Sequence, residues 1–303
     1  VGEGRRREPE VALSYVREGK DKVLDMMINF AHMEADCFIT DFLQRPFDLV
    51  KLKKAFTKWQ TKMYGKGWNA LYMENHDHPR IISRYGSEKY RVESGKSIAA
   101  SYLFQRGTPF VYQGQEIGMI NTPLPSLDDY KDIMVKNNAR IARSLGLSKE
   151  TVLRLAQKAS RDNARTCMQW SSAPNAGFTN GKPWFVVNSN YKDINVESQL
   201  DDPNSVLNFY RNALQFRRDN PVVIYGDYVE HMPKSKELYV YERNLAGKKL
   251  LVICSYSEKC VRFDAPDGIT LDETKQVFGN YDNNFVISNG FTTRPYEMRV
   301  YLF

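Results

Sequence analysis

The sequence is poor in histidine and cysteine and has no long apolar run. Four cysteines are scattered over 303 residues without a CxxC pair (Cys37, Cys167, Cys254 and Cys260), so their spacing indicates neither a zinc knuckle nor a disulfide framework. No window approaches the apolar length that crosses a bilayer, and no low-complexity tract or short repeat is present. These absences argue against a disulfide-rich scaffold, a membrane protein and a repeat array, and they favour a reducing, cytoplasmic setting.

The net charge of +7 raises the question of a nucleic-acid partner. Lysines and arginines are interleaved with acids along the whole chain, however, and only Arg5-Arg6-Arg7 forms a tight basic run. Three arginines are a small footprint for a nucleic-acid binder. The pattern favours a solvated basic surface, and we expect no nucleic-acid partner.

The first residues, VGEGRRREPE, include neither a starting methionine nor a signal peptide. They read as though the sequence enters in the middle of a strand. We therefore expect the chain to be part of a longer protein, in which case the missing signal peptide says little about localisation.

Helix and strand patterns alternate over the first two thirds of the chain. Residues 51–64 carry an apolar stripe spaced four, three and four (Leu52, Phe56, Trp59, Met63), which predicts a helix. Short apolar runs at 23–30, 68–73 and 109–114 predict buried strands, and 92–106 and 205–218 predict further helices. With VGE as the end of a strand, these elements make about four βα units of a parallel sheet, half of an eight-stranded barrel.

The pattern of helix and strand signals in the sequence changes twice after these units. Residues 114 to about 200 give mixed helix and loop signals and are expected to be a long insertion. From 227 onward, short strand-like runs alternate with turn residues and no helical stripe occurs, which predicts a compact all-β appendage. We therefore expect two domains, 1–226 and 227–303.

The stretch LYMENHDHPR, residues 71–80, concentrates polar chemistry at the predicted end of a buried strand. One interpretation is a structural network of Asn75, His76, Asp77 and Arg80. A second is a metal site on His76 and His78, although zinc needs three or four ligands and the other two histidines lie far away in the sequence. The third is a glycosidase pocket, in which an adjacent carboxylate and imidazole bond sugar hydroxyls.

A glycosidase pocket also needs a proton donor from another strand. Glu3 is the candidate, because it stands where VGE would leave its strand. Reactive groups of parallel α/β folds gather at the carboxyl ends of the strands, so Glu3 and Asp77 are expected to face one mouth. Arg80 could supply a fixed fork of donors to that site.

Several motifs together resemble a known family. They are VGE (1–3), NHDHPR (75–80) followed by SRYG, GTPFVYQGQEIGM (107–119), RDNARTCMQW (161–170), AGFTNGKPW (176–184) and TRPYEMRVYL near the end. In this order they are similar to the α-glucosidase branch of glycoside hydrolase family 13, which includes oligo-1,6-glucosidases, dextran glucosidases and trehalose-6-phosphate hydrolases. The likeness extends essentially from end to end.

The resemblance implies a fold, roles for four residues and an activity. The fold is the second half of a (β/α)8 barrel, about strands five to eight, followed by a small β-sandwich. Glu3 matches the general acid/base, Asp77 the transition-state-stabilising aspartate, His76 a histidine that bonds sugar hydroxyls, and Arg80 the arginine of the same block. No metal and no cofactor are implied. The substrate would be a short oligosaccharide with terminal α-linked glucose, α-1,6 favoured and α-1,4 possible.

The chain also departs from the family pattern. The nucleophilic aspartate, in a segment that reads GFRxD, is absent from this sequence, so we expect the chain alone to be inactive and to pair with the missing half of the barrel. Trehalose-6-phosphate hydrolase, sucrose isomerase and trehalose synthase remain alternatives, as does a non-enzymatic domain like the amino-acid-transporter heavy chains. Tyr85, Phe178 and Trp184 could stack on sugar, although core packing is the simpler reading of each.

Overall fold

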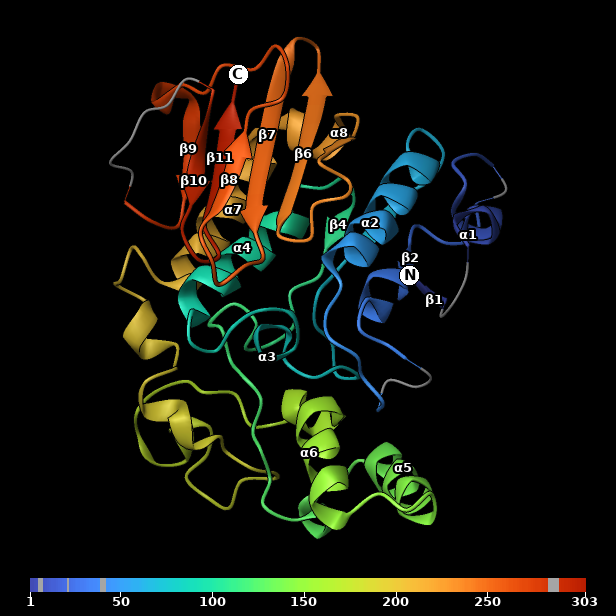
Figure 1. Cartoon of the computed structure of the whole chain (residues 1–303), viewed down its shortest axis with the longest axis vertical. Helices are drawn as coiled ribbons and strands as arrows, with labels where there is room; N and C mark the ends of the chain where they lie inside the picture. Colours follow the sequence, from blue (N-terminus) through green and yellow to red (C-terminus); the bar gives the residue numbers. More distant parts are fainter. Residues whose placement is uncertain (5–7, 21, 39–41, 283–288) are drawn as a thin grey trace.

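Four short parallel strands form one sheet in the first part of the chain; the elements are labelled in Figure 1 where there is room. The computed structural model describes residues 1–4, 8–20, 22–38, 42–282 and 289–303; the basic run at 5–7 lies outside them. The strands are β1 (Gly2–Gly4), β2 (Met27–Asn29), β3 (Asn69–Leu71) and β4 (Thr108–Pro109), each paired with its neighbour in sequence. The prediction of a parallel sheet built from βα units is confirmed.

Helices connect and cover these strands. They are α1 (Pro9–Val16), α2 (Leu49–Met63), α3 (Ile81–Tyr85) and α4 (Arg91–Leu103), with α7 (Val206–Asp219) and α8 (Pro221–Tyr225) after the insertion. In α2 the predicted stripe is buried, and Asp48 caps the helix by accepting hydrogen bonds from the backbone N–H groups of Val50 and Lys51. No helix in the described part of the chain is long and apolar enough to cross a membrane.

Two strands are shorter than the sequence predicted, for local reasons. In the run 23–30, the N–H groups of Val23 and Leu24 donate to the carbonyl of Tyr15, so pairing with β1 begins only at Met27. In the run 109–114, the Tyr112 N–H donates to the Gln115 side chain and Gly114 has φ +86°. A positive φ turns the chain out of an extended path, so β4 ends early.

The insertion forms a separate helical layer at the end of the molecule away from the β-rich part (Figure 1). It contains α5 (Ile133–Ser144), α6 (Lys149–Ala159) and the 3-10 turns 127–129, 161–164, 174–177, 189–192 and 197–199. Facing alanines and valines of α5 and α6 pack with Leu124, Tyr130 and Phe185 in a core of their own. This layer follows β4 in the chain, so it leaves the sheet at the carboxyl ends of the strands, where the polar loops also lie.

The last part of the chain is all β, as expected. A five-stranded antiparallel sheet has the order β5-β6-β7-β11-β9, and β8 pairs with β10 separately. The strands are β5 (Val229–His231), β6 (Leu238–Leu245), β7 (Lys248–Ser255), β8 (Val261–Asp264), β9 (Gln276–Gly279), β10 (Gly290–Thr293) and β11 (Met298–Leu302). Residues Ala246 and Gly247, both at positive φ, make the tight turn between β6 and β7.

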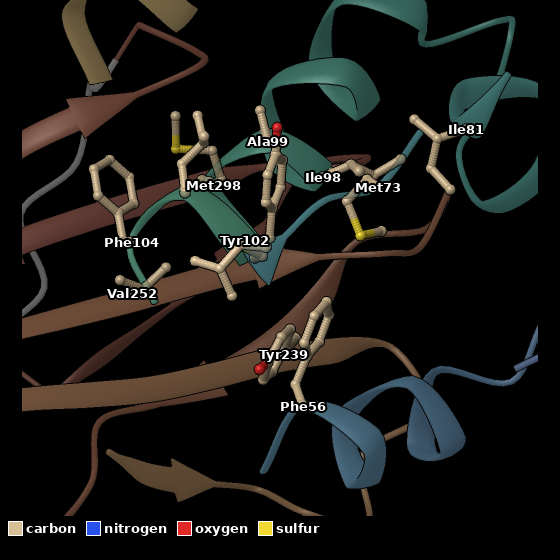
Figure 2. Close-up of a cluster of buried hydrophobic side chains, with 14 of the residues drawn as sticks. Phe56, Met73, Ile81, Ile98, Ala99, Tyr102, Phe104, Tyr239, Val252 and Met298 are labelled. Carbon is tan, nitrogen blue, oxygen red and sulfur yellow. The ribbon is translucent and has the colours of Figure 1, made fainter. Parts of the chain in front are cut away.

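One hydrophobic core joins the two parts. Tyr102 and Phe104, within and just after α4, are fully buried against Val252 of β7 and Met298 of β11 (Figure 2). Phe56 of α2 stacks on Tyr239 of β6 with ring centroids 6.1 Å apart. The β-rich part therefore covers the outer surface of the crossover helices. The carboxyl ends of the parallel strands, with their polar loops, lie on another side.

Lys53 adds a polar link at the same interface. Its side chain leaves α2, is fully buried, and its ammonium donates to the carbonyls of Met232, Ser235 and Leu238 at 2.7, 2.8 and 3.2 Å. The three acceptors lie between β5 and β6 or at the start of β6. An ammonium has three protons, so all of its donors are used.

Replacing Lys53 by methionine should keep the apolar stem and remove these bonds. Three carbonyls would then be buried without a donor, and we expect the free energy of unfolding to fall by about 3 kcal/mol. Urea unfolding followed by circular dichroism would measure this. The neighbouring Lys54 is exposed, so Lys54→Met is the matched control, with a change within about 0.5 kcal/mol. Equal midpoints for the two variants would contradict the assigned role.

Candidate active site

The loop after β3 presents a carboxylate and an imidazole at the surface. Asn75 accepts a hydrogen bond from the N–H of Asp77 at 2.8 Å, which folds the segment into a tight turn. The side chains of His76 and Asp77 are 67% and 36% exposed, and His76 Nε2 lies 3.7 Å from Asp77 Oδ2. The turn therefore presents both groups together.

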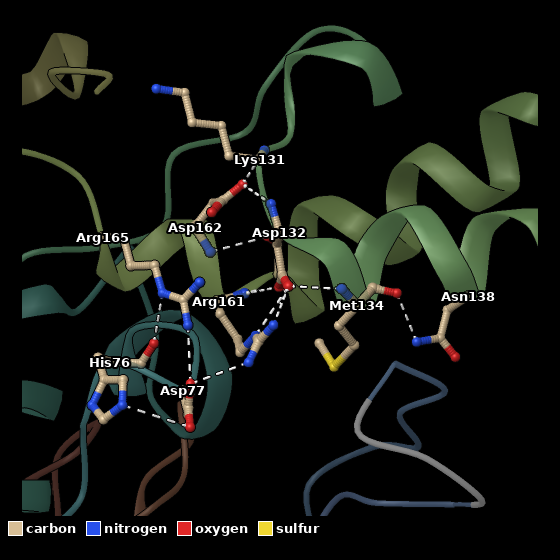
Figure 3. A network of polar contacts seen from close by, with 10 residues as sticks. His76, Asp77, Lys131, Asp132, Met134, Asn138, Arg161, Asp162 and Arg165 are labelled. Carbon is tan, nitrogen blue, oxygen red and sulfur yellow. Dashed lines mark hydrogen bonds and ion pairs between the residues drawn. The ribbon is translucent and has the colours of Figure 1, made fainter. Parts of the chain in front are cut away.

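Two arginines of the insertion bind the Asp77 carboxylate (Figure 3). Arg165 Nη2 donates to Oδ1 at 2.9 Å and Arg161 Nη1 donates to the same oxygen at 3.3 Å. Arg165 Nε also donates to the carbonyl of His76 at 2.9 Å. The arginines are 27% and 23% exposed, so Asp77 is charge-compensated while part of it still faces solvent.

Arg161 is itself fixed by a buried carboxylate. Its Nε and Nη2 donate to Asp132 Oδ1 at 3.0 and 2.6 Å, and its backbone N–H donates to Oδ2. Burial alone would raise the pKa of Asp132, but the bonds from Arg161 and the Met134 N–H outweigh it and lower that pKa below its ordinary value of 3.8. Asp162 in turn accepts from the N–H groups of Lys131 and Asp132.

Glu3 lies on β1, in the same sheet as the strand that leads to Asp77. It is paired in register with Ile28 of β2, which is paired with Ala70 of β3. Glu3 is exposed. Because the three strands are parallel, Glu3 and the loop that carries Asp77 belong to the same edge of the sheet, although Asp77 lies six residues beyond the end of β3.

Arg80 was predicted to supply donors to the substrate site, and the structure does not place it there. Its side chain is fully buried, and Nη1 donates to Glu74 Oε2 at 3.0 Å and to the Gln113 carbonyl at 2.7 Å. Its guanidinium has no surface to offer to a sugar. The structure places it beneath the loop because Glu74, at the end of an apolar segment, points inward and attracts it.

The structure also distinguishes between the alternative interpretations of the histidines and the aromatic residues. His78 is 6% exposed and packs against Phe30 and Tyr72, so it does not share a surface with His76. Among the described residues no group of three or more His, Cys, Asp or Glu side chains could hold a metal ion. Tyr85 is buried in the core, whereas Phe178 and Trp184 are 37% and 58% exposed.

Comparison with known proteins now identifies the family. The sequence model of the alpha-amylase catalytic domain matches residues 1–226. The chain belongs to the α-amylase family. It is 41% identical over 305 residues to an oligo-1,6-glucosidase of Parageobacillus thermoglucosidasius, covering 99% of this chain and 54% of that protein.

Solved structures of this family agree. The trehalose-6-phosphate hydrolase of Bacillus licheniformis superposes with a TM-score of 0.92 at 38% identity, covering 99% of this chain and 55% of that one. The isomaltulose synthase of Klebsiella sp. LX3 gives 0.92 at 30% identity, covering 99% and 55%. The chain thus spans about half the length of the relatives it matches.

Sequence reasoning missed two of the residues that meet at Asp77. RDNARTCMQW was used only as a family motif, yet its arginines at 161 and 165 are four residues apart. That spacing brings two side chains to one side of an α-helix; here the segment is a 3-10 turn at 161–164 followed by Arg165, and both guanidinium groups still reach Asp77. The signal was therefore present, but nothing in the sequence named Asp77 as the partner.

Asp132→Asn should destabilise the fold by about 2 kcal/mol near neutral pH, because the partly buried Arg161 would lose its carboxylate. The folded pKa of Asp132 is lowered, so its stabilising effect is complete above the ordinary value and is lost as the pH falls through the folded value. Urea unfolding of both proteins should therefore give a gap that is constant down to about pH 5 and shrinks below about pH 4.

The exposed Asp128 provides the control for this experiment. Asp128→Asn should follow the wild type at every pH. A gap for Asp132→Asn that persists unchanged to pH 3 would show that the charge of Asp132 contributes nothing to stability.

Proposed function

We propose that the chain forms the second half of the barrel, about strands five to eight, and the C-terminal β domain of a retaining α-glucosidase that acts on short oligosaccharides. The proposal depends mainly on Asp77, whose carboxylate is paired with arginine and is exposed beside His76. Both residues lie on the side of the sheet, at the carboxyl ends of the strands, that also bears Glu3. A glycoside hydrolase needs a proton donor and a charge that stabilises an oxocarbenium-like state at one site.

Each residue has a role in this reaction. Glu3 protonates the departing glycosidic oxygen and then activates water, since acid and base are one group in a retaining mechanism. Asp77 stabilises positive charge that develops on the sugar ring, and His76 bonds ring hydroxyls. The carboxylate that attacks the anomeric carbon comes from a segment outside these 303 residues. Arg161 and Arg165 orient the Asp77 carboxylate by donating hydrogen bonds to its Oδ1.

The names of the relatives support the proposed substrate class. The similarity to an oligo-1,6-glucosidase favours α-1,6-linked glucose as the substrate of this chain, and we propose α-1,4 links as the second choice. Trehalose-6-phosphate hydrolysis and the isomerisation of sucrose are the alternatives within the family. A non-enzymatic, transporter-heavy-chain-like role is disfavoured because both Glu3 and Asp77 are present. Four free cysteines are consistent with our proposal of a cytoplasmic setting.

The sheet edges support a partner that supplies more strands. In the described residues β1 and β4 each pair on one side only. An open groove of about 690 Å³ includes Pro109 of β4 and is also lined by Leu214 and Ile224 with arginines of α7. Near β1, Val11, Tyr15 and Val23 are 41–69% exposed. Unpaired edges beside apolar surface are typical of a surface that another segment covers.

The isolated chain should show no meaningful turnover of nitrophenyl α-glucoside, because the proposed mechanism requires a nucleophile from outside it. Release of nitrophenol measured by absorbance provides the test. Robust turnover by the purified 303-residue chain would refute the assignment of the nucleophile to another segment.

Fusing the chain to the unmatched part of the Parageobacillus thermoglucosidasius enzyme should produce a protein that hydrolyses isomaltose. In that fusion Glu3→Gln and Asp77→Asn should each lower kcat by about a thousandfold, since each removes a group that acts in the transition state. Glu10→Gln, an exposed carboxylate of α1, is the control and should leave kcat unchanged. If both site variants kept wild-type activity, the catalytic roles proposed for Glu3 and Asp77 would be wrong.

The isolated chain should also associate in solution through its open edges. Light scattering at increasing concentration should show a mass above 35.1 kDa, and addition of the unmatched part should replace self-association by a complex of the two. A monomeric mass at high concentration would count against this.

A further inference from the structure

A single buried carboxylate closes the loop that carries His76 and Asp77. Glu74 precedes the loop and is 2% exposed. Its Oε1 accepts from the N–H of Ile81 at 2.8 Å and its Oε2 accepts from Arg80 Nη1 at 3.0 Å. The residue before the loop is therefore bonded to the two residues at its far end, which fixes the span of the five residues between them.

Arg80 ties the closed loop to the loop after β4. Its Nη1 also donates to the carbonyl of Gln113 at 2.7 Å. At Gly114, which has φ +86°, an added Cβ would lie 3.1 Å from both terminal nitrogens of Arg80 and 2.3 Å from Met119 Sδ. The guanidinium can lie this close only because position 114 has no side chain. The loop after β3 and the loop after β4 are thus held as one unit.

A second acid beside Glu74 can serve as its matched control. Glu116 is a second carboxylate close to Glu74 and Arg80; burial raises the pKa of both glutamates, and Arg80 opposes the rise. Among the described residues, no hydrogen bond joins the Glu116 side chain to residues 75–81. Two neighbouring acids therefore share an environment, but only Glu74 contacts the ends of the loop.

We propose that Glu74 is a positioning residue for Asp77 and His76, which acts by clamping the loop through the Ile81 N–H and Arg80. The catalytic part of this inference rests on the proposed function of Asp77, and the structural part does not. Displacement of a reacting group by about 1 Å can cost a hundredfold in rate, so a clamp beneath the loop has a direct effect on turnover.

Glu74→Gln tests the clamp and Glu116→Gln is its isosteric control. A glutamine amide has one acceptor oxygen in place of two, so either the Ile81 N–H or Arg80 Nη1 would face its NH2 group, and Arg80 would lose its carboxylate. We expect hydrogen exchange of the Ile81 amide to become at least tenfold faster in Glu74→Gln, and to change less than threefold in Glu116→Gln. The chain has only four histidines, so the imidazole resonances of His76 can be resolved at fixed pH and should move only in Glu74→Gln.

Gly114→Ala is a second variant in case Glu74→Gln fails to fold. It leaves Glu74 intact and displaces Arg80, and it should move the His76 resonances and speed exchange at Ile81 in the same direction. Exchange and resonances that stay at wild-type values in the folded clamp variants, or that change equally in Glu116→Gln, would overturn the proposal.

Activity of the fusion described above separates the two levels of the inference. Glu74→Gln should lower kcat about a hundredfold with KM changed less than threefold, and Glu116→Gln should retain most of kcat. An inactive wild-type fusion would count against the proposed function, whereas the exchange result on the isolated chain would still support or overturn the clamp. An active fusion in which the two variants have equal kcat would overturn the positioning role.

Discussion

Arg161 bridges two carboxylates that come from different parts of the chain, and the arrangement of the site depends on that bridge. It binds Asp132 at the start of α5 and Asp77 in the loop after β3. The helical layer of the insertion thereby becomes a fixed wall beside the strand edge. Because Asp132 is fully buried and Arg161 is only partly exposed, removing one partner of this pair leaves a buried or partly buried charge unpaired, which costs more than breaking a surface ion pair.

The sequence predicted the elements that follow from periodicity and missed those that follow from side-chain direction. The stripe of α2 and the buried run that became β3 were identified because apolar spacing depends only on the local chain. Arg80 was predicted to contribute to the substrate site because its motif gave its identity without its direction. That direction is set by Glu74 and by the close approach at Gly114, which lie in two segments of the chain, the loop after β3 and the loop after β4.

The long-range partners of the site illustrate the same limit. Arg165 and Asp77 are 88 residues apart in sequence, and no spacing rule relates them. Glu3 and Asp77 were assigned to one edge from topology alone, since parallel strands joined by crossover helices end together. Topological reasoning therefore predicts where the site lies, whereas the identity of the groups that surround Asp77 required coordinates.

The double occupation of Asp77 Oδ1 has a thermodynamic consequence for any hydroxyl-bearing ligand. The carboxylate has already exchanged part of its hydration shell for guanidinium donors, and only its remaining lone pairs are solvated. An incoming hydroxyl would meet a pre-ordered, partly desolvated acceptor instead of dehydrating a free anion. The enthalpy of that contact would be modest, and most of the discrimination would come from geometry, because the acceptor directions are set before the ligand arrives.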